Sequence, residues 1–164
     1  MSTYANRTET PVAKSKMEIE RILTRYGASA FGYATEGTRA QVTFKAHGRF
    51  IALLIPLPDP DEDRFKYTTR AGRVTYTRRT DASKVAAYEL ACRQVWRALA
   101  LVIKAKLEAV DAGIASFENE FLAYTKLPDG QTVGAWMEPQ IEEAYRLGAM
   151  PSVLIALPTA RVES

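Results

Sequence analysis

The carboxylates that follow the proline-rich segment 56–60 come closer to a catalytic or metal site than any other group in this chain. Asp59, Asp61, Glu62 and Asp63 precede Lys66. Carboxylates with a lysine are the residue types that nucleases use, and carboxylates alone bind Ca²⁺. The spacing fits neither site, because the glycine and the final glutamate of a calcium loop are missing and no strand carries both a second carboxylate and the lysine. We interpret the segment as a solvated acidic loop, and an enzyme with a carboxylate-based site ranks last among the alternatives.

His47 and Cys92 are the only histidine and the only cysteine in the chain. A zinc site needs three or four such ligands, and a Ser-His-Asp or Cys-His arrangement would have to use His47. His47 precedes Gly48 in a turn-like pair, and Cys92 lies in an apolar helical stripe, which is typical of an inert core thiol. Glycine loops that bind phosphate and the GxSxG motif are absent. We therefore expect no catalytic residue, no metal ion and no cofactor.

Length and composition favour one domain in a reducing compartment. The chain has 164 residues, 47% of them hydrophobic, which is enough to bury a core. A single cysteine rules out a disulfide within the chain, so we expect a cytoplasmic protein. No apolar run reaches the roughly 18–20 residues that cross a bilayer, so we expect no membrane contact. Residues 1–13 are polar and predict a disordered tail before one domain, 14–164, with a core at 15–113 and a helical C-terminal region at 114–164.

Basic residues are concentrated in one segment, although the net charge is only +3. Seven basic residues and one acid, Asp81, lie between Arg64 and Lys84, which gives 7 − 1 = +6. The other residues carry 15 − 18 = −3. This segregation indicates an anionic partner at one place on the molecule.

Three strands follow an N-terminal helix. The helix is predicted to begin at Ser15, because Ser15 and Glu18 form a capping box, and to end at Gly27. Strands are predicted at 29–35, 38–46 and 49–57, joined by tight turns and paired as an antiparallel meander. Residues alternate along the second strand, so Arg39 and Lys45 share one of its faces.

Residues 82–112 predict one long helix with Thr80 or Asp81 as its N-cap. Arg93, Arg97 and Lys104 fall within about 40° of one another on it, although acids share that side and an ordinary solvated face is the alternative. Further along, Ser116 is predicted to cap a short helix. Pro139 is predicted to open a last helix that Gly148 closes, and an apolar run follows at 153–157. The predicted class is α+β: an antiparallel meander with a basic hairpin, packed on one long helix, an N-terminal helix and a short helical C-terminal region.

The basic segment has the pattern of a β-hairpin. Residues 65–69 and 74–77 are β-prone and Ala71-Gly72 can turn, so we expect a protruding hairpin, with a flexible arm as the alternative. Phe65, Tyr67 and Tyr76 are interleaved with its cations. Single-stranded nucleic acid needs cations for phosphates and flat rings for bases, and arginine suits both roles. The predicted contacts are Arg64, Lys66, Tyr67, Arg70, Arg73, Tyr76, Arg78 and Arg79; a solvated loop that merely keeps the protein in solution is the alternative.

The order helix, meander, basic hairpin, long helix over residues 15–113 resembles the core of single-strand annealing proteins. That group includes the eukaryotic recombination mediators and the phage annealases related to the lambda beta protein. The resemblance implies rings or filaments of identical subunits around single-stranded DNA. It adds Arg39 and Lys45 on the sheet and Arg93 and Arg97 on the long helix to the hairpin as contact residues.

The chain is also similar to small proteins of phages and prophages, on the stretches 16–20, 25–28 and 127–130. We therefore expect a non-enzymatic protein that binds or anneals single-stranded DNA in phage replication or recombination. The alternative is a phage-encoded protein that binds and inhibits a host factor or defence system. In that case the basic hairpin would dock an acidic protein surface and nucleic acid would bind poorly. Docking to a protein needs no rings for stacking, so Tyr67→Ala and Tyr76→Ala should matter only if the chain binds nucleic acid.

Overall fold

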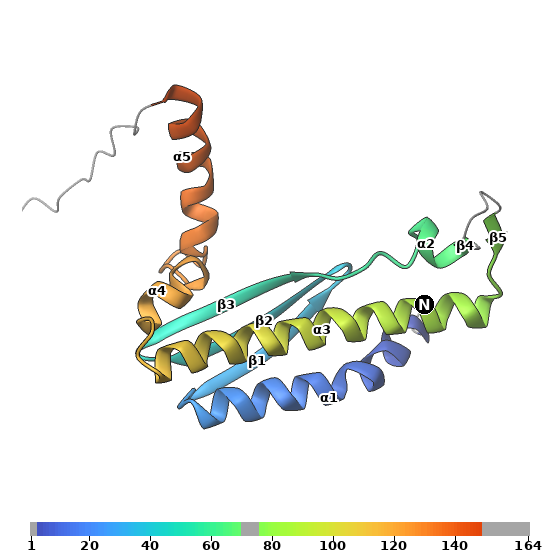
Figure 1. Cartoon of the computed structure of the whole chain (residues 1–164), viewed down its shortest axis with the longest axis horizontal. Coiled ribbons are helices and arrows are strands. Elements are labelled where there is room, and N and C mark those ends of the chain that lie inside the picture. Colours follow the sequence, from blue (N-terminus) through green and yellow to red (C-terminus); the bar gives the residue numbers. More distant parts are fainter. Residues whose placement is uncertain (1–2, 70–75, 149–164) are drawn as a thin grey trace, which may run out of the picture.

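A three-stranded antiparallel sheet and two long helices form the body of the molecule, an α+β architecture as the sequence predicts (Figure 1). The sheet contains β1 (Ala30–Glu36), β2 (Arg39–Ala46) and β3 (Arg49–Pro56) in the order β1-β2-β3. The helices are α1 (Thr3–Arg25) and α3 (Asp81–Asp111). The structure, a computed structural model, describes residues 3–69 and 76–148.

Tight turns hold the meander in register. Ala46 pairs with Arg49 across a two-residue turn in which both His47 (φ 49°) and Gly48 (φ 73°) are left-handed. This backbone twist matches the twist of the flanking strands, which is why such turns favour hairpins. The predicted strand bounds agree with the structure to within one residue.

One face of the sheet packs against both helices. Ala40, Val42, Phe44 and Ala46 on β2 are buried, and they share a core with residues of α1 and α3 such as Leu23 and Ile103. Alternation along a strand then places Arg39 and Lys45 on the opposite face. The predicted boundaries of the long helix are confirmed: the Thr80 side chain accepts a hydrogen bond from the Ser83 N–H, and the chain leaves the helix before Gly113.

The predicted start of the first helix is wrong. α1 begins at Thr3, so Ser15 lies inside it and residues 3–13, expected in a disordered tail, are helical. Val12 explains the difference, because it is 3% exposed and lies in the core on the same helical side as Ile19 and Leu23. A capping box is a local signal, and burial of an upstream residue overrides it. The predicted end holds, since Gly27 (φ 81°) follows the helix.

The C-terminal region contains α4 (Phe117–Phe121), the 3-10 turn η1 (Leu122–Tyr124) and α5 (Val133–Leu147). Ser116 caps α4 as predicted. α5 begins six residues before Pro139, because the Thr132 hydroxyl accepts from the Ala135 N–H and caps it there. Pro139 is therefore an interior residue rather than the first of the helix. The predicted apolar run 153–157 lies outside the described residues.

Two short strands and one helical turn form the opposite end of the molecule. α2 (Asp63–Lys66) leads into β4 (Tyr67–Thr69), which pairs with β5 (Tyr76–Arg78) just before α3 (Figure 1). The expected turn at Ala71-Gly72 lies outside the described residues. Among the described helices, even the 31-residue α3 lacks the continuous apolar stretch that a bilayer crossing needs.

Candidate nucleic-acid interface

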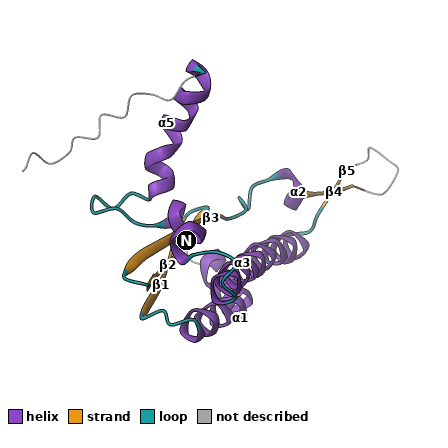
Figure 2. Cartoon of the chain, turned by 60° about the vertical axis from the view of Figure 1, so that its left-hand side comes forward, coloured by secondary structure: helices purple, strands orange, loops and turns teal. Residues whose placement is uncertain are grey.

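The basic segment forms an antiparallel hairpin over its described residues. Tyr67 lies opposite Arg78, and Thr68 lies opposite Thr77 and donates from Oγ1 to the Thr77 carbonyl at 3.3 Å. A further bond from the Arg79 N–H to the Lys66 carbonyl, 2.8 Å long, continues the pairing toward α3. In Figures 1 and 2 the hairpin stands at the end of the molecule, beyond the sheet.

Phe65 does not belong to the exposed aromatic set that the sequence indicates. It lies in α2, is 3% exposed, and its ring meets the Tyr88 ring of α3 edge-on at 5.6 Å. The Arg64 guanidinium covers the Phe65 ring, 4.7 Å from its centroid. Phe65 therefore anchors the segment to the core, because a buried ring gains more from packing than from exposure to bases. Tyr67, 38% exposed, remains on the surface.

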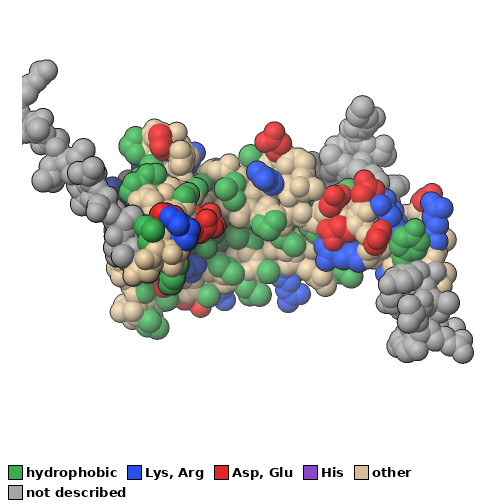
Figure 3. Space-filling view, turned by 90° about the horizontal axis from the view of Figure 1, so that it is seen from above, with side chains coloured by type: hydrophobic (Ala, Val, Ile, Leu, Met, Phe, Trp, Pro, Cys, Tyr) green, Lys and Arg blue, Asp and Glu red, His purple; other side chains and the backbone are tan. Residues whose placement is uncertain are grey.

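The acidic loop folds onto the basic segment. Glu62 pairs with Arg64 at 2.7 Å, and Asp61 pairs with Lys84 at 3.3 Å and with Lys66 at 3.9 Å. Acidic and basic side chains accordingly lie side by side at this end of the molecule (Figure 3). The net charge over residues 59–84 is 7 − 5 = +2. Because the acidic loop lies against the basic segment, this end of the molecule is less positive than the +6 counted for the basic segment alone.

The carboxylates of the loop have separate roles. The Asp59 N–H donates to Glu62 Oε1 and the Asp61 N–H donates to Asp59 Oδ1, both at 2.8 Å, so Asp59 and Glu62 close the loop. The Asp61 carboxylate is directed instead toward the two lysines. No group of three or more acidic, histidine or cysteine residues that could hold a metal ion occurs in the described part of the chain. Asp61 and Glu62 therefore hold three basic side chains at this end of the molecule through ion pairs.

The remaining hairpin residues differ in their surroundings. Arg78 is exposed, whereas Arg79 is half-buried and donates from Nη1 to Ser83 Oγ at 3.2 Å. The Arg79 Nε is buried with no hydrogen-bond partner in the structure. Tyr76 lies in β5 opposite Thr69. Arg70 and Arg73 lie outside the described residues, so their predicted contacts stay predictions.

The structure does not bring the other four predicted contact residues together with the hairpin. Arg39 and Lys45 are exposed on the sheet face that points away from α1 and α3. Arg93 and Arg97 are exposed on α3, about 18 and 24 Å along the helix from Asp81 at 1.5 Å per residue. The sheet therefore separates the first pair from the second, and the predicted residues form three surfaces rather than one.

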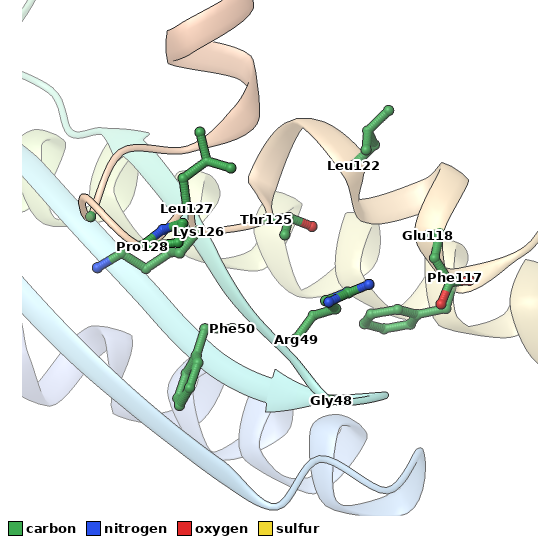
Figure 4. Close-up of a pocket in the computed structure, with 11 residues that line it drawn as sticks. Gly48, Arg49, Phe50, Phe117, Glu118, Leu122, Thr125, Lys126, Leu127 and Pro128 are labelled. Carbon is green, nitrogen blue, oxygen red and sulfur yellow. The ribbon is translucent and has the colours of Figure 1, made fainter. Parts of the chain in front are cut away.

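A hollow that has no signal in the sequence lies at the other end of the sheet (Figure 4). It has a volume of about 780 Å³ and lies between the β2–β3 turn, α4 and the segment before α5. A bridge between Ile51 and Thr125 and a bond from the Lys126 N–H to the Phe50 carbonyl join that segment to β3. Arg49, Lys126 and Glu118 are its charged residues. The sequence predicts the short helix and the turn but carries no signal that they meet β3.

The single cysteine and the single histidine both pack against other side chains. Cys92 is 1% exposed in the core, and burial raises the pKa of its thiol, as expected of an inert side chain. His47 occupies the predicted turn and stacks on the Phe117 ring at 4.4 Å. Comparisons of the chain with protein-family models, with curated proteins and with solved structures find no match.

Proposed function

We propose that this chain is a non-enzymatic protein that binds single-stranded nucleic acid at its hairpin end. The observation that supports the proposal is the cross-strand pair of Tyr67 and Arg78 on an exposed hairpin outside the core. Residues directly opposite each other in an antiparallel pair project their side chains to the same face, so the Tyr67 ring and the Arg78 guanidinium start from neighbouring positions on one face of the hairpin. One can stack on a base while the other contacts the adjacent phosphate.

Binding at this end requires an exchange of partners. Lys66 and Lys84 contact Asp61, and Arg64 contacts Glu62, so a phosphate has to displace a carboxylate at each. Exposed ion pairs are worth only ~0.2–1 kcal/mol, which makes the exchange feasible. Each cation transferred to a phosphate adds a slope of about −0.7 to the dependence of log K on log salt for a single strand. The proposal therefore predicts moderate affinity that falls with salt.

Fluorescence anisotropy of a labelled single-stranded oligonucleotide tests the proposal. Wild type would be compared with the double variant Arg73→Gln, Arg78→Gln over a series of salt concentrations. The double variant Arg21→Gln, Arg25→Gln is the control, because it removes the same charge from exposed positions at the far end of α1 (Figure 1). We expect the hairpin variant alone to lose affinity and salt dependence. Equal losses in both variants, or no binding by wild type at low salt, would refute the proposal.

Substitutions of Tyr67 separate stacking from charge. Tyr67→Ala is expected to weaken binding by ~1–3 kcal/mol, the value of one stacked base. Tyr67→Phe keeps the ring and is expected to bind like wild type. If both variants bind like wild type while the arginine variant does not, the hairpin acts through charge alone and the single-strand proposal fails.

The resemblance to annealing proteins extends the proposal to phage recombination. A protein of that kind would accelerate the pairing of two complementary strands beyond their spontaneous rate. A strand-annealing assay with wild type and the hairpin variant tests this extension separately from binding.

A second candidate function is a protein-interaction module that inhibits a host factor. It is favoured by apolar side chains that the nucleic-acid proposal does not use: on α5, Trp136 is 47%, Ile141 48% and Tyr145 86% exposed. Exposed apolar groups on one element are typical of binding surfaces. Under this reading nucleic acid binds poorly, and the hairpin docks an acidic protein surface.

A further inference from the structure

One exposed ring on the sheet lies between two lysines. Phe50 of β3 is 56% exposed and lies opposite Lys45, on the sheet face that points away from α1 and α3. On the other side of β3, Ile51 forms a bridge with Thr125. The Lys126 N–H donates to the Phe50 carbonyl at 2.8 Å, so Lys126 is opposite Phe50 and projects to the same face, as Figure 4 shows. The face thus carries the row Lys45, Phe50, Lys126.

The two lysines are free to bind an anion. Neither Lys45 nor Lys126 forms an ion pair within the described part of the chain. Glu118 lines the same hollow as Lys126, but no ion pair joins them. The hairpin end differs, because Asp61 and Glu62 hold its cations there. A phosphate that binds beside Phe50 therefore displaces no carboxylate.

An exposed ring with a cation on each side has the chemistry that an unpaired base and its phosphates require. The Lys45 Nζ lies 5.2 Å from the centroid of the Phe50 ring, and this cation–π contact holds the lysine beside the ring without neutralising its charge. Neighbouring strands are ~5 Å apart, so the two lysines begin about 10 Å from each other with the ring between them. A base stacked on Phe50 would have its flanking phosphates within reach of Lys45 and Lys126.

We propose that Phe50, Lys45 and Lys126, the Phe50 site, bind one unpaired base of a single-stranded nucleic acid and the phosphates on either side of it. The inference rests on the proposed function for its ligand and adds a second contact at the end of the sheet remote from the hairpin. Phe50 and Pro56 are about 20 Å apart along β3, so a strand that reaches both contacts has to run along the sheet. Arg39, which pairs with Pro56 at the other end of the sheet, lies outside the site.

Anisotropy titrations of a labelled single-stranded oligonucleotide test the ring, with the hairpin variant Arg73→Gln, Arg78→Gln measured in parallel. Phe50→Ala is expected to weaken binding about 5- to 150-fold, the effect of losing one stacked base. Phe50→Tyr keeps a ring and is expected to bind like wild type. Leu54→Ala is the matched control, because Leu54 is 65% exposed on the same face of β3 but pairs with Gln41 rather than with a lysine. It is expected to bind like wild type.

The same titrations over a series of salt concentrations test the two lysines. The double variant Lys45→Gln, Lys126→Gln is expected to lower the slope of log K against log salt by about 1.4, or about 0.7 for each lysine that contacts a phosphate. The double variant Arg21→Gln, Arg25→Gln removes the same charge from α1 and is expected to keep the wild-type slope. Equal changes in the two double variants would show an effect of overall charge and would overturn the proposal.

The pattern of losses separates this inference from the proposed function. We expect both the hairpin variant and Phe50→Ala to bind more weakly than wild type. If the hairpin variant loses affinity and Phe50→Ala does not, the Phe50 site is wrong and the hairpin proposal stands. If Phe50→Ala loses affinity and the hairpin variant does not, the hairpin proposal is wrong and the Phe50 site stands. Equal losses in Phe50→Ala and Leu54→Ala, or no binding by wild type at low salt, would overturn the inference.

Discussion

Asp61→Asn is expected to tighten single-strand binding, although Asp61 is not itself one of the predicted contact residues. The Asp61 side chain is 74% exposed and pairs with Lys84 at 3.3 Å and Lys66 at 3.9 Å. The Asp61 side chain takes no part in the hydrogen bonds within the loop, because the side chains of Asp59 and Glu62 accept those bonds. The free energy of unfolding should therefore change by less than about 0.5 kcal/mol. Asparagine has nearly the same shape and no charge, so both lysines become available to phosphate.

The size of the effect follows from the two ion pairs. At ~0.2–1 kcal/mol per exposed pair, breaking both ion pairs costs wild type ~0.4–2 kcal/mol of binding free energy, which corresponds to about 2- to 30-fold in Kd. The 3.9 Å contact is at the limit of an ion pair, so we expect a gain near the lower end, about threefold. The salt slope should become steeper by about 0.7 for each lysine that reaches a phosphate. Near 1 M salt, where the Debye length is about 3 Å, the gain should vanish.

Anisotropy titrations of wild type, Asp61→Asn and Glu108→Gln form the assay. Glu108 pairs with Lys104 at 3.6 Å on α3, so Glu108→Gln also frees one lysine and raises the net charge by the same amount. Only Asp61→Asn should bind more tightly. If both variants gain equally, overall charge accounts for the effect, and if neither gains, the loop does not compete with nucleic acid. Either result would refute the reasoning.

Three other predictions concern the body of the molecule. The Tyr33 hydroxyl donates to the Lys16 carbonyl at 2.8 Å, and burial, with Glu20 nearby, raises its pKa from 10.0 to about 12. Because the folded pKa is the higher one, stability is expected to fall as the pH rises from 10.0 to about 12. In urea titrations near neutral pH, the free energy of unfolding of Tyr33→Phe should be ~1 kcal/mol below that of wild type. Its further decrease at alkaline pH should be smaller than the decrease in wild type. Cys92 should react with a thiol reagent only after the protein unfolds, and mass spectrometry of the labelled protein checks this. Rapid labelling of the native protein would contradict the burial of Cys92. Phe121→Ala should lower the free energy of unfolding in urea by ~3–5 kcal/mol, because Phe121 is fully buried and its ring centroid lies 5.7 Å from that of Phe44. Leu122→Ala is the control and should lower it little, because Leu122 is 55% exposed. Equal losses in the two variants would show that α4 is not part of the core.

The sequence by itself determined the elements whose signals are local. The Thr80 cap and the apolar stripe of α3 each involve residues within a few positions of one another, and so do the His47-Gly48 turn and the alternation along β2. Local hydrogen bonds and side-chain periodicity decide such features, so the strands and the long helix could be located without coordinates. The hairpin pattern between Tyr67 and Arg78 belongs to the same class.

Only the tertiary structure decided which of these elements meet. Lys84 pairs with Asp61 across 23 positions, and Phe65 packs on Tyr88, so part of the segment with the highest charge is neutralised and one of its rings is buried. Val12 extends α1 beyond its capping box, because packing against the core outweighs a local cap. The bridge between Ile51 of β3 and Thr125 is likewise invisible in the sequence, because it joins residues that lie far apart along the chain. These features depend on contacts between distant residues, which neither spacing nor propensity encodes.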